Sequence, residues 1–157
     1  IHRWQELTPV MLEGLVQLTL GAPMHLSHGG LQHGRLRYFD EVNRRPGLPE
    51  DVAACVENLD ATSVTVSLIN LHTSEIRNLI VQAGTFAEHQ FGQVHVLDER
   101  GEVSHSLTVA DACFSVELKA GAGTRLHLTQ QRYTHQPSYR SPWTLPEQLP
   151  LIQGREV

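Results

Sequence analysis

The sequence predicts a mainly β protein: an antiparallel β-sandwich with one N-terminal helix and an extended, proline-rich C-terminal arm. From Thr62 onward, apolar and polar residues alternate with a period of two, which is typical of half-buried strands. These short segments recur at intervals of roughly ten residues, as in sandwiches and barrels. The strand–helix–strand alternation of a parallel sheet is absent from the pattern.

The N-terminal segment carries the signals of a helix over residues 9–20. Thr8 is suited to the N-cap, and Pro9 falls at the first helical position, where its missing N–H costs nothing. Gly21 is placed for a left-handed C-terminal cap, and Pro23 prevents continuation. Apolar residues cover much of the circumference, so we expect the helix to be buried on more than one side, between this domain and another surface.

Residues 24–34 form a loop rich in glycine and histidine. His25, His28 and His33 have spacings at which imidazole nitrogens can converge on zinc or copper, and the glycines would let the backbone wrap an ion. The alternative is that these are ordinary loop histidines, bonded to backbone or solvent. With no cysteine or acidic residue inside the loop to complete a ligand set, we expect no cofactor. His95 and His127 fall on the polar side of predicted strands, and His72, His89, His105 and His135 lie near turns, where we expect them to be solvated.

The central part, residues 35–129, is expected to form the sandwich. Residues 49–56 fit either a short helix or an extended segment. Phe114, Val116 and Leu118 alternate with polar residues, as do Leu126 and Leu128 after a glycine-containing turn, so this pair predicts a hairpin. The predicted strands cover residues 35–40, 62–71, 76–83, 93–97, 104–109, 113–118 and 125–129.

The arm, residues 130–157, holds four of the eight prolines, which exclude helix and interior strand. Tyr133, Tyr139 and Trp143 lie along it. These rings either anchor the arm to the protein or form a stacking platform for sugars. Residues 1–34, 35–129 and 130–157 are expected to belong to one domain.

Composition excludes several functions. With 12 Lys and Arg against 17 Asp and Glu, the net charge of −5 argues against nucleic acid and anionic membranes as partners. No apolar run is long enough to span a bilayer. The sequence contains no G-x-S-x-G elbow, no phosphate-binding loop and no C-x-x-C motif.

The cysteines and carboxylates give no clear catalytic pattern. Cys55 and Cys113 can pair only if their Cα atoms come within about 7 Å, and otherwise they are buried thiols. The apolar strand around Cys113 argues against a nucleophile. No carboxylate pair stands out for glycoside cleavage. The candidates are Asp40, Glu41, Glu50, Asp51, Glu57, Glu88 and Asp111. Asp40-Glu41 and Glu50-Asp51 flank a loop with proline and glycine, and we expect them to be solvated turn residues.

The segment from Phe114 to Trp143 resembles part of a known family. Residues 116–128, Val-Glu-Leu-Lys-Ala-Gly-Ala-Gly-Thr-Arg-Leu-His-Leu, are similar to the closing hairpin of C-terminal β-sandwich accessory domains of bacterial glycoside-hydrolase-like proteins. The strand from Val64 to Leu71, with Asn70 near its end, resembles an earlier strand of such domains. The resemblance implies a non-catalytic domain that packs against a catalytic domain or, less often, binds carbohydrate.

We therefore expect a non-catalytic accessory domain of a larger bacterial protein, which packs against a partner domain or subunit through the helix 9–20 and the arm 130–150. The alternatives are a carbohydrate-binding module that uses Tyr133, Tyr139 and Trp143, and a metal site at His25, His28 and His33.

Overall fold

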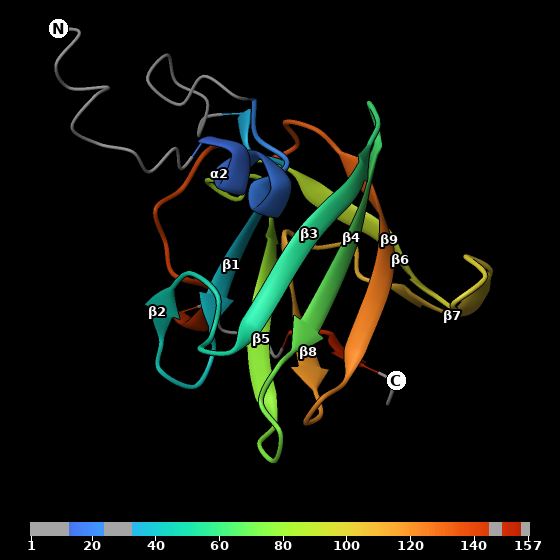
Figure 1. Ribbon diagram of the computed structural model, residues 1–157. Helices are drawn as coiled ribbons and strands as arrows, with labels where there is room; N and C mark the ends of the chain where they lie inside the picture. The colour runs from blue at the N-terminus through green and yellow to red at the C-terminus, as the bar shows by residue number, and fades with distance from the viewer. Residues whose placement is uncertain (1–12, 24–32, 145–148, 155–157) are drawn as a thin grey trace, which may run out of the picture.

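The computed structural model describes residues 13–23, 33–144 and 149–154, which form two five-stranded sheets packed face to face (Figure 1). Sheet A has the order β10 (Leu151–Gln153), β8 (Cys113–Leu118), β5 (Arg77–Ala83), β1 (Leu36–Asp40) and β2 (Arg45–Pro46). Sheet B has the order β3 (Val52–Leu59), β4 (Ser63–Asn70), β9 (Gly123–Gln131), β6 (Gln90–Leu97) and β7 (Val103–Thr108). The predicted mainly β sandwich with one helix near the N-terminus is confirmed.

The core lies between the sheets. Val64, Val66 and Leu68 of β4 are at most 1% exposed, because alternate residues of a strand point to the same face. Phe91 of β6 and Phe114 of β8 meet across the core with ring centroids 5.0 Å apart, in an edge-on arrangement. The period of two in the sequence is thus the signature of one face buried against the opposite sheet.

The predicted hairpin of residues 113–118 with 125–129 is wrong. β8 pairs with β5 and β10 in sheet A, whereas β9 pairs with β4 and β6 in sheet B. The turn between them therefore carries the chain from one sheet to the other. Alternation shows that residues face a core, but it does not show whether consecutive strands lie side by side or opposite one another. Residues 49–56, for which helix and strand were both open, contribute to β3.

The helix α2 (Glu13–Leu20) lies at one end of the sandwich and packs against β3 (Figure 1). It ends where predicted: Gly21 has φ 61° and donates its N–H to the Gln17 carbonyl over 3.0 Å. Positions 9–12 of the predicted helix lie outside the described residues. Leu15 and Leu18 are 60% and 54% exposed, so one side of this helix has no cover within the described chain. No described helix is long and apolar enough to cross a membrane.

The C-terminal arm lies on its own domain. The 3-10 turn η3 (Pro142–Thr144) places Trp143 edge-on to Phe39, with ring centroids 5.8 Å apart. Trp143 and Leu149 pack on a small apolar cluster of sheet A that also contains Ile80. The chain then enters β10, which pairs in parallel with β8. The arm supplies an edge strand, which the prolines allow, so the sandwich extends beyond the predicted 35–129.

Candidate functional sites

The predicted histidine site is only partly described. His33 is exposed, and His25 and His28 lie outside the described residues. Within residues 13–23, 33–144 and 149–154, no group of three or more His, Cys, Asp or Glu side chains is arranged to hold a metal ion.

The three aromatic residues of the arm each pack on a different residue. Trp143 contacts Phe39, Tyr139 lies edge-on to Phe86, and Tyr133 lies edge-on to His89. Tyr139 is 87% exposed and Tyr133 is 59% exposed, whereas Trp143 is half-buried. Trp143 thus acts as an anchor of the arm, and the two tyrosines leave most of their ring surface to solvent.

The two cysteines are both free thiols. Cys55 is exposed on β3, and Cys113 is buried beneath the arm. Burial raises the pKa of the Cys113 thiol to about 12, with a further contribution from Asp111. A thiol in this environment stays protonated at neutral pH, which disfavours attack by Cys113 as a nucleophile.

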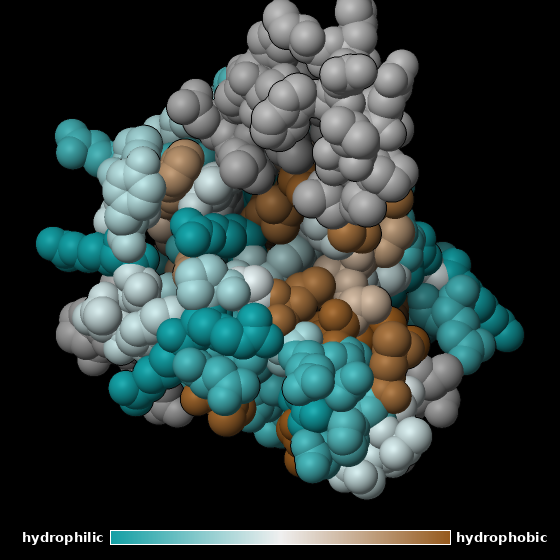
Figure 2. All heavy atoms as spheres, turned by 60° about the vertical axis from the view of Figure 1, so that its left-hand side comes forward, coloured by the Kyte–Doolittle hydropathy of each residue, from teal (hydrophilic) through white to brown (hydrophobic). Residues whose placement is uncertain are grey.

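A hollow of about 390 Å³ lies between α2 and β3. Leu18 of the helix, Val56 and Leu59 of β3 and the Ala22–Pro23 segment supply apolar walls. Arg35, Arg132 and His33 supply the basic groups. Figure 2 shows hydrophobic residues gathered across the middle of one face of the molecule.

Arg35 is 5% exposed and has no carboxylate partner among the described residues. Its Nε donates to Gln130 Oε1 over 2.9 Å and its Nη1 to the Asp60 carbonyl over 2.8 Å, while Nη2 has no hydrogen-bond partner. Burial lowers the pKa of Arg35, and the nearby charge of Arg132 lowers it further. A buried charge normally has a counter-charge, so this guanidinium leaves one buried donor unsatisfied; among the described residues the acceptor Glu88 Oε1 is likewise buried without a hydrogen-bond partner.

A buried acid–imidazole pair, Glu88 and His89, lies in the loop after β5. Glu88 is 2% and His89 is 1% exposed, and His89 Nε2 lies 3.8 Å from Glu88 Oε1. The backbone N–H groups of Phe86 and Tyr133 donate to Glu88 Oε2 (2.7 Å) and His89 Nδ1 (3.0 Å). Burial lowers the pKa of His89, so the ring is neutral and accepts this bond. The pair fastens the start of the arm to the sandwich.

A second imidazole pair lies on the outer face of sheet B. His95 and His127 are cross-strand partners, with ring centroids 6.0 Å apart. Their Nδ1 atoms are hydrogen-bonded to Ser106 and Thr65, at 2.7 and 3.1 Å. Both rings face outward on the polar side of their strands, as the sequence predicts. Two imidazoles alone supply fewer ligands than a specific zinc site uses.

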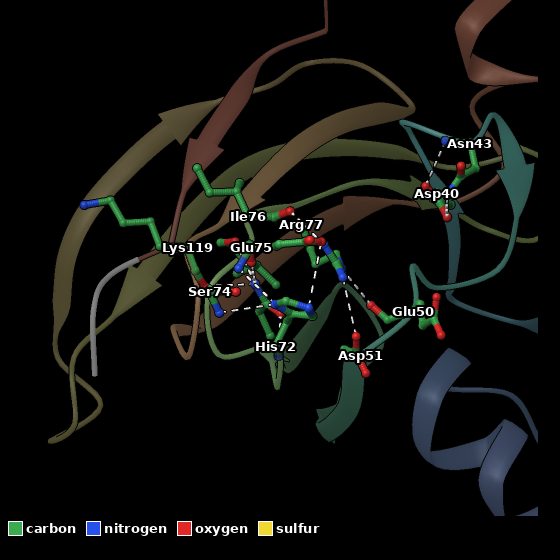
Figure 3. Close-up of polar contacts among 12 residues, drawn as sticks. Asp40, Asn43, Glu50, Asp51, His72, Ser74, Glu75, Ile76, Arg77 and Lys119 are labelled. Carbon is green, nitrogen blue, oxygen red and sulfur yellow. Dashed lines mark hydrogen bonds and ion pairs between the residues drawn. The ribbon is translucent and has the colours of Figure 1, made fainter.

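The polar cluster at the end opposite α2 fixes loops. Figure 3 shows Arg77 between the turn after β4 and the segment before β3. Arg77 pairs with Glu75 over 2.6 Å and with Asp51 over 3.4 Å, and His72 Nδ1 accepts the N–H of Glu75 over 2.9 Å. The hydrogen bond from Arg77 lowers the pKa of Glu75, with a smaller effect of His72. Each charge here has a partner, so the arrangement has no free group to offer a substrate.

Asp40 is 1% exposed, although the sequence suggested a solvated turn residue. Its carboxylate accepts the N–H and side-chain amide of Asn43 at 3.1 and 2.9 Å and pairs with Arg45 at 3.2 Å (Figure 3). Despite the opposing effect of burial, these hydrogen bonds and the Arg45 charge lower the pKa of Asp40. The bonds close the β1–β2 turn.

Sequence reasoning missed Arg35, and it assigned His89 to solvent. Arg35 begins a strand and looks like any other arginine of the chain. His89 adjoins a turn, and its burial depends on the arm returning over it. The one local signal is Glu88-His89, an acid beside an imidazole just before the apolar Phe91.

The described residues define a class: a two-sheet β-sandwich, antiparallel except for the β8–β10 pair, with a helix near the N-terminus and a buried arginine lining a surface hollow. Comparison with known proteins finds no matching family model, no matching curated protein and no matching solved structure.

Proposed function

We propose that the chain is a non-catalytic accessory domain that docks against another domain of a larger protein. The docking surface consists of the outward side of α2, with Leu15 and Leu18, and the free edge of β3. The observation that carries the proposal is that two leucines of an eight-residue helix are more than half exposed beside an unpaired strand edge. Exposed apolar surface of this kind marks interaction sites.

The edge of β3 supports the same proposal. Among the described strands, β3 pairs only with β4, so the N–H and C=O groups along its other edge have no strand partner. Natural edge strands are usually protected by lysine, proline or shortness. β3 has eight residues, Val-Ala-Ala-Cys-Val-Glu-Asn-Leu, and neither lysine nor proline. Its protection is a bulge between Val56 and Asn58, which leaves the first half regular.

The arm contributes less to this proposal than the sequence suggested. Trp143 and Leu149 are used within the domain, where they cover sheet A. The resemblance to accessory domains of bacterial glycoside-hydrolase-like proteins also loses its main support, because the segments likened to a closing hairpin lie in different sheets. The docking proposal therefore depends on the surface of α2 and β3.

The test is association of this chain with the remainder of its reading frame, produced separately and mixed in an analytical ultracentrifuge. We expect Leu15→Glu to weaken association at least tenfold, because a charge replaces a buried apolar contact. Val103→Glu, at an exposed apolar position on the opposite edge strand β7, is the matched control and should have no effect. A reading frame without a further domain, or equal effects of the two variants, contradicts the proposal.

A further inference from the structure

We propose that the hollow between α2 and β3 binds a small organic acid, whose carboxylate pairs with Arg35 and whose short apolar body lies against Leu18 and Leu59. Every residue involved belongs to this chain, so ligand binding does not require the docking partner proposed above, although Leu18 belongs to both surfaces. A pocket beside a docking surface is also a common place for a ligand, since pockets occur preferentially at domain interfaces.

Among the described residues, no carboxylate accepts a hydrogen bond from the Arg35 guanidinium, although the charge of Asp60 acts on it. The two groups that accept its hydrogen bonds, Gln130 Oε1 and the Asp60 carbonyl, are both neutral. The Asp60 carboxylate instead accepts from Asn58 and Ser63, at 2.8 and 3.3 Å. The unpartnered Nη2 of Arg35 can donate to a carboxylate oxygen of a ligand. Hydrogen bonds between charged groups of this type are stronger than those between neutral groups.

The side chain of Arg35 is held in one position by Gln130 and by the close approach of Gly21. Gln130 Nε2 donates to the Arg35 carbonyl over 3.0 Å while its Oε1 accepts from Nε, so one amide binds both the backbone and the side chain of Arg35. The Arg35 side chain also packs under Gly21, where a Cβ would lie 3.3 Å from that of Arg35. The guanidinium loses little entropy on binding because it is already fixed.

The described lining of the hollow carries more basic than acidic side chains. Arg132 and His33 add basic groups to the hollow. Among the described lining residues the acidic one is Glu57, and it is already engaged: its Oε2 lies 2.6 Å from Arg125 Nη2, and its Oε1 accepts from Ser67. The hollow is therefore a basic site on a chain whose net charge is −5, and it selects anions.

The volume and the apolar walls of the hollow indicate which kind of anion fits it. A volume of about 390 Å³ falls in the range of small-molecule pockets. Three side chains, Leu18, Val56 and Leu59, form apolar walls that offer a phosphate or sulfate nothing to bind. A carboxylate on a short hydrocarbon stem satisfies both the unpartnered Nη2 of Arg35, which is buried and which the ligand has to uncover, and these walls.

The experiment is titration of the ¹⁵N-labelled chain with sodium hexanoate, followed by amide and arginine side-chain NMR shifts. We expect saturable shifts around Arg35 and Leu59, with affinity falling up to about fourfold for each methylene removed. Hexan-1-ol, hexylammonium and inorganic phosphate should bind at least tenfold more weakly. Equal binding of hexan-1-ol or of phosphate, or no saturable binding of hexanoate, overturns the proposal.

Two variants test the residues. Arg35→Gln should abolish binding, and its thermal unfolding shows whether the fold persists. Leu18→Glu should leave the fold intact because Leu18 is exposed. It should weaken hexanoate binding at least tenfold, because the new carboxylate repels that of the ligand and the apolar contact with Leu18 is lost. Leu15→Glu, on the same helix but outside the hollow, is the matched control and should bind as the unaltered chain does. Equal affinities of the two leucine variants would contradict the assignment.

Discussion

Substitution of Gly84 by alanine tests whether the buried Glu88 carboxylate holds the loop after β5. Gly84 has φ 84°, and a Cβ there would lie 2.5 Å from the Glu88 carboxyl carbon. The left-handed backbone costs an alanine about 1–2 kcal/mol. Displacing the carboxylate from the Phe86 N–H removes a charge-assisted bond of about 1.5–3 kcal/mol. We expect Gly84→Ala to lower the free energy of unfolding by about 2.5–5 kcal/mol.

Gly121 provides the matched control, because it has φ 66° with nothing within 4 Å of its Cβ position. Gly121→Ala should cost only the backbone strain, about 1–2 kcal/mol. Urea unfolding at pH 7.5, followed by circular dichroism, gives both values. If the two variants are equally destabilised, the Glu88 carboxylate contributes nothing at this position and the reasoning is refuted.

Two further predictions concern the arm and its anchor. Because burial lowers the folded-state pKa of His89 below 6.5, the unfolded chain binds the proton first as pH falls. The contribution of His89 to stability is therefore complete above about pH 6.5 and decreases below it. In urea unfolding measured at several pH values, His89→Gln should flatten the decrease of the unfolding free energy below that pH. An unchanged slope of unfolding free energy against pH would count against a neutral buried ring. Trp143→Ala should lower the unfolding free energy by about 2 kcal/mol, while Tyr139→Ala, at a position 87% exposed, should change it by less than about 0.5 kcal/mol. Similar losses in the two aromatic variants would mean that Trp143 is no special anchor.

The sequence predicted the elements of this fold better than their partners. Pro23 and Gly21 mark the helix end because their backbone chemistry is local. The alternation of Phe114 and Leu126 predicts two strands, but the sheet each strand joins depends on packing across the core. Local patterns carry no information on such contacts between residues far apart in the chain.

The same distinction applies to the sites. His127 was correctly placed on an outer face, because strand parity decides it. Arg35 was missed, since its burial depends on Gln130 and Asp60, both distant in sequence. The exposure of Leu15 also required the structure, because an apolar helix predicts a covered face without saying which part of the chain covers it.

Hydrogen exchange of β3 in the larger protein proposed above, compared with that in the 157-residue chain, tests the docking surface most directly. Covering an edge strand gives its outward N–H groups partners, so the outward-facing amides within Val52–Val56 should exchange at least tenfold more slowly in the larger protein, while those of β7 stay unchanged. Identical exchange of β3 in the two samples would show that this edge remains free, and would contradict the account.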